Sequence, residues 1–180
     1  HFESTNGGSY ELRHFKAGLR PNMVPQDAIA TIVTPANEAA VALKTAFEAY
    51  VAANPISGTA DVIGEKVEIK LIGKSAHGAN PQAGINAATY LAVFLEDFDF
   101  GGGAKNFIAT ASHVHLDVYG EKLGVAHDDE KMGKLTMNAG LFEFTAGEEG
   151  AYMNFNFRYP QGTDKETLAA GIEQSIGQYV

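Results

Sequence analysis

Alternating apolar and polar positions predict a chain rich in strands. Val67, Ile69 and Leu71 alternate with Glu68 and Lys70, which predicts a half-buried strand over residues 66–73. Further strands are expected at 10–19, 28–33 and 59–64, followed by a hairpin of 135–146 and 151–159. Most of these strands are neighbours in sequence, so antiparallel pairing is expected.

Helical spacing of apolar residues predicts three helices. The first covers residues 35–54, the second runs from Pro81 to about Asp97, and the third follows Thr163. Asn80 and Pro81 are expected to start the second helix, and Thr163 with Glu166 to form a capping box for the third. Their expected core stripes are Ala39, Leu43, Phe47, Tyr50 and Val51; Ala87, Leu91, Phe94 and Phe98; and Leu168, Ile172 and Ile176.

Together these elements predict an α+β fold, a two-layer sandwich with helices on one face of a mainly antiparallel sheet. Residues 66–180 have the order β-α-insertion-β-β-α, a ferredoxin-like unit short of its last strand, and residues 1–65 form an extra N-terminal ββαβ half. The insertion, at about 100–133, is expected to be irregular and partly helical. A phosphate-binding loop follows a strand and precedes a helix, and the sequence predicts neither around Gly101–Gly103. This segment is therefore interpreted as a linker or hinge.

Composition narrows the possible partners. The 180 residues are 45% hydrophobic, enough for a substantial core, and carry a net charge of −9 with 13 basic residues. This balance argues against binding to nucleic acid or an anionic membrane, and no apolar run reaches the roughly 20 residues of a membrane span. The absence of cysteine fits a reducing compartment, so we expect a cytoplasmic protein. A start at His1 suggests a fragment or a processed chain.

Three residues are candidates for chemistry. His77 follows a strand in the polar connection 73–86, which a substrate could reach; alternatively, it only bonds its own turn. Arg158 belongs to a polar stripe with Asn154 and Asn156, opposite the expected core face of Met153, Phe155, Phe157 and Tyr159. Its guanidinium could grip a carboxylate or pair with a surface acid. Asn22, which lies between two prolines, is the third candidate. Alternatively, it is simply a turn residue, because asparagine is common in turns.

Two histidine-containing segments are candidates for metal sites. His113, His115 and Asp117 would share one face of a strand, and His127 begins the run His-Asp-Asp-Glu. Neither has a second cluster at a known ligand spacing. We therefore favour solvated loops over an intrinsic metal site.

The segment Gly-Lys-Ser-Ala-His-Gly-Ala-Asn-Pro-Gln-Ala-Gly-Ile-Asn at 73–86 resembles a signature of the di-zinc aminopeptidase, carboxypeptidase and aminoacylase family. That signature belongs to the family's lid, or dimerisation, domain. Residues 17–25 are similar to the Asn-containing loop of its PepV-type bacterial dipeptidase branch, and residues 154–164 to its Arg-containing strand and turn. The resemblance covers nearly the whole chain, in order.

The resemblance implies roles for the three candidates. The family histidine matching His77 stabilises the oxyanion of the tetrahedral intermediate, the arginine matching Arg158 grips the substrate's C-terminal carboxylate, and the asparagine matching Asn22 reaches into the substrate site. The family's zinc ligands lie in a separate catalytic domain, and none of those segments is found here. The resemblance implies a monomeric lid that is inactive alone. Its expected partners are the catalytic domain of the same polypeptide and a dipeptide substrate.

Two other functions remain open. The chain could be a non-enzymatic ferredoxin-like module for binding or oligomerisation, in which His77 and Arg158 bind an unrelated anion or nothing. It could also be a free-standing hydrolase that uses His113, His115 and His127, which would require these side chains to converge on a metal. Metal-binding sequences on either side of the chain would favour the lid.

Overall fold

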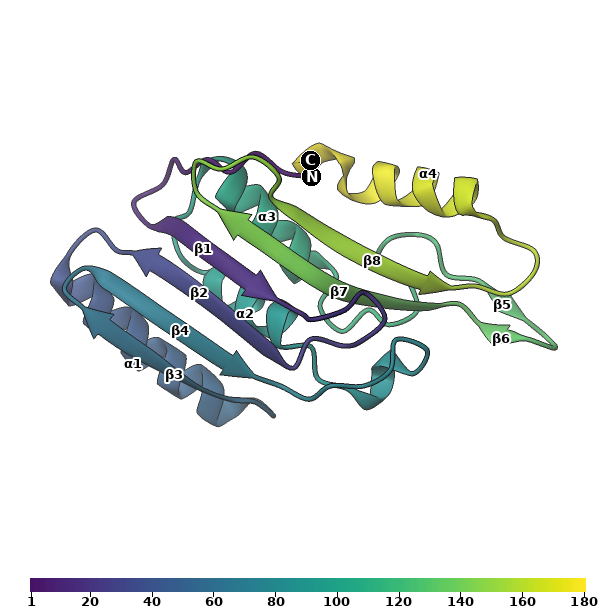
Figure 1. Cartoon of the computed structure of the whole chain (residues 1–180), viewed down its shortest axis with the longest axis horizontal. Coiled ribbons are helices and arrows are strands. Elements are labelled where there is room, and N and C mark those ends of the chain that lie inside the picture. The colour runs from purple at the N-terminus through teal and green to yellow at the C-terminus, as the bar shows by residue number, and fades with distance from the viewer.

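A computed structural model describes all residues from His1 to Val180. Six strands form one sheet in the order β3-β4-β2-β1-β7-β8, and every adjacent pair is antiparallel (Figure 1). The strands are β1 (Glu11–Ala17), β2 (Asp27–Val33), β3 (Ser57–Ile63), β4 (Lys66–Ile72), β7 (Thr136–Thr145) and β8 (Tyr152–Arg158). A separate hairpin contains β5 (Asp128–Asp129) and β6 (Gly133–Lys134).

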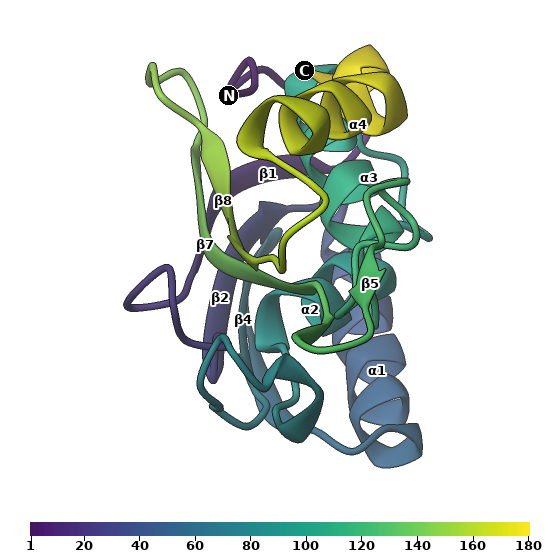
Figure 2. The ribbon, with the colours of Figure 1, turned by 90° about the vertical axis from the view of Figure 1, so that its right-hand side faces the viewer.

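The helices cover one face of the sheet, as Figure 2 shows with the sheet nearly edge on. They are α1 (Asn37–Ala53), α2 (Ala87–Leu95), α3 (Gly102–His113) and α4 (Lys165–Ile176). This arrangement confirms the predicted α+β two-layer sandwich. No helix combines the length and apolar character that a membrane crossing would need.

Strand alternation explains how the core forms between these layers. Phe15, Ile69 and Phe142 point to the helices and are almost fully buried, whereas their strand neighbours point to the other face. Aromatic rings continue the contact across layers: Phe107 of α3 packs edge-on against Phe15, with ring centroids 5.3 Å apart. The sheet's opposite face, hereafter the open face, carries no helix (Figure 2).

The order of elements agrees with the two expected segments, ββαβ and then β-α-insertion-β-β-α. In space, however, β2 and β1 lie between β4 and β7, so one continuous sheet runs through both segments. The boundary at residue 65 stays a prediction.

Two helix starts differ from those predicted. Pro81–Ala83 forms a short 3-10 turn, and α2 begins at Ala87, because the side chain of Asn86 accepts hydrogen bonds from the amides of the first turn. At α4 the cap is Asp164 rather than Thr163, since its carboxylate accepts the Thr167 N–H at 2.8 Å. The short polar side chain nearest the first free amides provides the cap in both places.

Some core positions also shift by a residue. In α1 the fully buried alanine is Ala40 rather than Ala39. Tyr159 lies beyond the end of β8 and is 44% exposed, so it leaves the predicted core face. Met153, Phe155 and Phe157 do pack against the core.

Gly101–Gly103 is not the linker that the sequence suggested. These residues open helix α3 and are clamped by the N-terminal segment, because Thr5 accepts hydrogen bonds from Gly103 N through its hydroxyl (2.9 Å) and from Ala104 N through its carbonyl (2.8 Å). A Cβ at Gly103 would lie 1.6 Å from the Glu3 carbonyl oxygen. The glycines therefore allow two backbones to touch.

This contact predicts that Gly103→Ala destabilises the fold, although alanine is the better helix former. The methyl group must displace the backbone at Glu3, and overpacking of this kind costs about 1–3 kcal/mol. Urea denaturation measures the loss. Gly177→Ala is the control, since the nearest atom to its added Cβ is Glu173 Cγ at 3.5 Å. Equal stability of the two variants would contradict the clamp.

Candidate functional site

Asn22 lies in the connection between β1 and β2. The Met23 N–H donates to the Arg20 carbonyl at 3.2 Å, which closes a β-turn with Pro21 and Asn22 at its centre. Proline presets the backbone for the second position of such a turn, so the sequence specifies the turn locally. Asn22 itself is exposed.

His77 lies in the connection that follows β4, and its side chain is exposed. The Ala79 N–H donates to Nδ1 of His77 at 3.0 Å. Because Nδ1 acts as an acceptor, a neutral imidazole must carry its hydrogen on Nε2. The turn thus fixes the tautomer and leaves Nε2–H as a donor.

Backbone hydrogen bonds join the two connections. The Gly78 N–H donates to the Asn22 carbonyl at 2.7 Å, and the Val24 N–H donates to the Ala76 carbonyl at 2.9 Å. Met23 and His77 consequently face each other as an isolated antiparallel bridge. Asn22 and His77, far apart in sequence, belong to one paired structure.

Arg158 is the last residue of β8 and is exposed. It pairs with Thr136 across the hairpin, so its side chain lies on the open face, as does that of Asn138 two residues along β7. Arg158 takes part in none of the three ion pairs in the chain, which leaves its guanidinium available.

The three predicted site residues therefore occur at one end of the sheet. β1, β4 and β8 all finish at this end, which is the right-hand end in Figure 1. β7 begins there, and Asn138 of β7 donates hydrogen bonds to the backbone on both sides of Asn22. The arrangement offers an imidazole N–H, an amide and a guanidinium, a set of donors suited to oxygen atoms and carboxylates.

His113 and His115 do not share a strand face, as the sequence suggested. They lie at the end of α3 and in the turn after it, because the helix continues through the expected irregular segment. His113 Nε2–H donates to the Lys122 carbonyl at 3.0 Å, whereas His115 Nδ1 is 3.0 Å from Thr89 Oγ1. Asp117 is 9% exposed and accepts hydrogen bonds from three backbone amides.

The second segment, from His127, forms the β5-β6 hairpin and packs against the turn after β8. His127 Nε2–H donates to the Gln161 carbonyl at 3.1 Å. Amide hydrogen bonds from Met132 and Lys131, with a further one from the Gln161 side chain, hold the pKa of Asp129 below its usual value. Nowhere do three or more His, Cys, Asp or Glu side chains gather in a way that could hold a metal ion.

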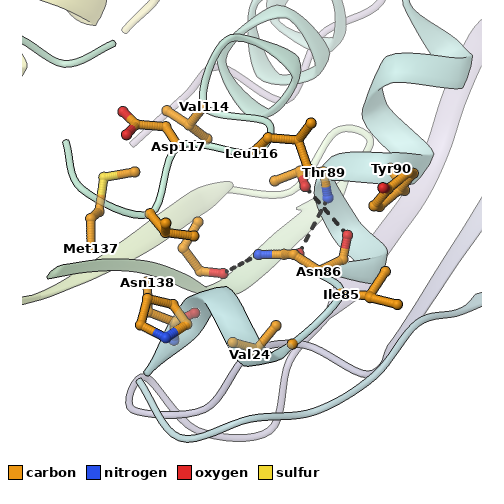
Figure 3. Close-up of a pocket in the computed structure, with 14 residues that line it drawn as sticks. Val24, Ile85, Asn86, Thr89, Tyr90, Val114, Leu116, Asp117, Met137 and Asn138 are labelled. Carbon is orange, nitrogen blue, oxygen red and sulfur yellow. Dashed lines mark hydrogen bonds between the residues drawn. The ribbon is translucent and has the colours of Figure 1, made fainter. Parts of the chain in front are cut away.

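A small cavity of about 80 Å³ is lined in part by the end of the His77 connection (Figure 3). Its wall includes Val24, Ile85, Leu116 and Met137, and Asn86 crosses it to reach β7. Leu116 is 71% exposed and has a φ of 63°, a conformation that non-glycine residues rarely adopt. Both the start of α2 and the loop after α3 contribute to the lining of this cavity.

Sequence reasoning missed two asparagines that support the site. Asn86 caps α2 and donates to the Ala139 carbonyl at 2.9 Å, and Asn138 donates to the Asn22 turn. Each had a local signal. Asn86 directly precedes an apolar helical run, and Asn138 is a poor strand former two residues before Gly140 in a strand.

The fold is an open-faced α+β sandwich whose polar connections gather at one end of the sheet. Comparison with known proteins shows the family to which the chain belongs. A family model described as peptidase dimerisation domain matches residues 65–179. The chain is 41% identical over 173 residues to the Beta-Ala-Xaa dipeptidase of Lactobacillus delbrueckii subsp. lactis, with 96% of this chain and 35% of that protein covered. This chain belongs to the dimerisation-domain family of the M20 peptidases.

A protein of Staphylococcus saprophyticus with a provisional dipeptidase name is 34% identical over 172 residues, which covers 93% of this chain and 36% of that protein. A similarly named protein of Staphylococcus aureus is 32% identical over 178 residues, with 98% and 37% covered. The chain thus spans about a third of the length of the curated relatives it matches.

His115 predicts a pH-dependent stability. Burial, together with the nearby charge of Lys122, lowers the pKa of His115 to about 4 from its ordinary value of 6.5. Between these pH values the unfolded chain binds more protons than the folded one, so the free energy of unfolding should fall as the pH drops from about 6.5 to about 4.

Urea denaturation across this range measures the effect. His115→Gln should flatten the pH dependence, whereas His113→Gln, at an exposed position, should leave it unchanged. An identical pH dependence in wild type and His115→Gln would show that His115 is protonated in the folded chain as readily as in the unfolded one.

Proposed function

We propose that this chain is the lid domain of a dipeptidase, which binds the substrate and stabilises the oxyanion while a separate catalytic domain of the same polypeptide cleaves the peptide bond. Family membership and the dipeptidase names of the relatives support the reaction class. The shared position of His77, Asn22 and Arg158 at one sheet end supports the assignment of the site.

The observation that carries this proposal is the fixed tautomer of His77. Attack on a peptide carbonyl places negative charge on its oxygen, and a catalyst gains most from a donor already aimed at that position. The Ala79 N–H holds Nδ1 as an acceptor, so Nε2–H is presented to solvent without a rearrangement of the turn. His77 would donate to the oxyanion when the lid closes over the substrate.

Arg158 and Asn22 would bind the remainder of the dipeptide. A guanidinium offers a planar pair of donors that matches a carboxylate, and Arg158 has no acidic partner to compete with the substrate. In this proposal Arg158 binds the C-terminal carboxylate, and Asn22 contacts the substrate from the neighbouring loop.

Zinc belongs to the proposed catalytic domain. The side chains of this chain do not fit the metal, because the histidine-containing segments are engaged with backbone carbonyls and amides and no ligand group converges. We assign the metal chemistry to residues outside this chain, and we place the complete enzyme in the cytoplasm.

In the full-length protein, His77→Ala is expected to lower kcat about 100- to 1,000-fold, the usual effect of losing an oxyanion donor, with a smaller change in KM. Steady-state kinetics on a dipeptide measures both constants. His113→Ala is the matched control, because that histidine bonds Lys122 away from the site. A large rise in KM with an unchanged kcat would assign His77 to ground-state binding.

Arg158→Lys is expected to weaken the binding of a free dipeptide sharply, because an ammonium cannot reproduce the two-donor contact with a carboxylate. The test compares a dipeptide with its C-terminally amidated analogue in wild type and variant. Wild type should prefer the free acid, and the substitution should remove most of that preference. If both substrates lose equally, Arg158 does not recognise the carboxylate.

A further inference from the structure

The first half of β7 continues past the end of β1. β1 pairs with β7 only as far as Ala17 opposite Phe142, so residues 138–140 have no strand on that side. We call these three residues, Asn138, Ala139 and Gly140, the β7 anchor. The Asn22 turn occupies the place beside them that a longer β1 would fill.

Asn138 is only 2% exposed, although its side chain lies on the open face. The turn covers it, and its amide donates to the Pro21 carbonyl and to the Met23 carbonyl, each at 2.9 Å. These two carbonyls flank Asn22. Both donors of one buried amide are therefore used to hold a single turn.

Glycine makes this close approach possible. A Cβ at Gly140 would lie 2.4 Å from the Pro21 carbonyl oxygen. Gly18 has a φ of 87°, and a Cβ there would lie 1.9 Å from the Gly140 carbonyl oxygen. The turn thus rests directly on the backbone of the β7 anchor.

The His77 connection is attached to the same anchor directly at one point and through the Asn22 turn at another. Near its middle, the Gly78 N–H donates to the Asn22 carbonyl, so the His77 turn depends on the position of the Asn22 turn. At its end, the Asn86 amide donates to the Ala139 carbonyl, the bond drawn in Figure 3. One three-residue segment supports both connections.

We propose that Asn138 is a positioning residue, which holds the Asn22 turn and, through it, the turn that presents His77. It reaches no substrate itself. The catalytic consequence of this inference rests on the proposed function, but the positioning does not. If Asn138 is replaced, the two turns should loosen together while the sheet stays intact.

Hydrogen exchange of this chain, followed by NMR, tests the positioning. Asn138→Leu removes both donors while keeping the number and branching of the side-chain heavy atoms, and Asn138→Asp turns a carboxylate toward two carbonyl oxygens. In either variant the amides of Gly78 and Val24 should exchange about 10-fold faster or more, because the loss of two buried hydrogen bonds loosens the turn locally. Amides in the β2-β4 ladder should keep their exchange rates.

Asn54→Leu is the matched control, since that amide also donates to a backbone carbonyl, of Tyr50, but at the end of α1. It should leave Gly78 and Val24 unchanged. Unchanged exchange at these amides in both Asn138 variants would overturn the proposal, as would uniform acceleration throughout the sheet, which marks a merely structural role.

Kinetics of the full-length protein then tests the consequence. Misplacing His77 and Asn22 should lower kcat/KM for a dipeptide about 10- to 100-fold per folded molecule, with both kcat and KM affected. Faster exchange with unchanged kinetics would support the positioning by Asn138 and contradict the proposed function of the loops. The experiments therefore distinguish a failure of the positioning role of Asn138 from a failure of the proposed function.

Discussion

The candidate site depends on a mismatch in strand length. β7 extends beyond β1, so its backbone at residues 138–140 has no neighbouring strand on the β1 side and must find other partners. The Asn86 side chain donates to the Ala139 carbonyl of β7, and the Asn138 side chain donates to two carbonyls of the turn that lies where a longer β1 would run. The same mismatch gives the domain a polar end, where irregular backbone is supported by a rigid sheet.

Local patterns predicted the elements whose stability is local. Alternation located β4, and helical spacing located α1 and α2, because each buries a face that is visible in its own sequence. Only a partly helical insertion was expected where α3 lies, and the bounds of this helix were not predicted, since it opens with Gly101–Gly103, which is typical of a chain break. Its start is stabilised by Thr5, whose hydroxyl accepts the Gly103 N–H from 98 positions away. No window of sequence contains that interaction.

The site shows the same division. The position of His77 after a strand could be predicted from its neighbours, and its tautomer follows from Ala79, two residues away. The support from Asn138 could not be predicted, because it acts across 115 and 117 positions. The prediction that His113 and His115 share one face of a strand was wrong for a related reason. Their spacing fits a strand, but α3 continues to His113, so the backbone there is helical.

The bridge between Met23 and His77 has a consequence for ligand binding. A flexible loop loses conformational freedom when it closes on a ligand, and that loss weakens the affinity. Here the two connections are already paired with each other and fastened to β7, so most of their backbone freedom disappears when the chain folds. A ligand at this end of the sheet meets a preorganised surface, and only side chains remain to be ordered.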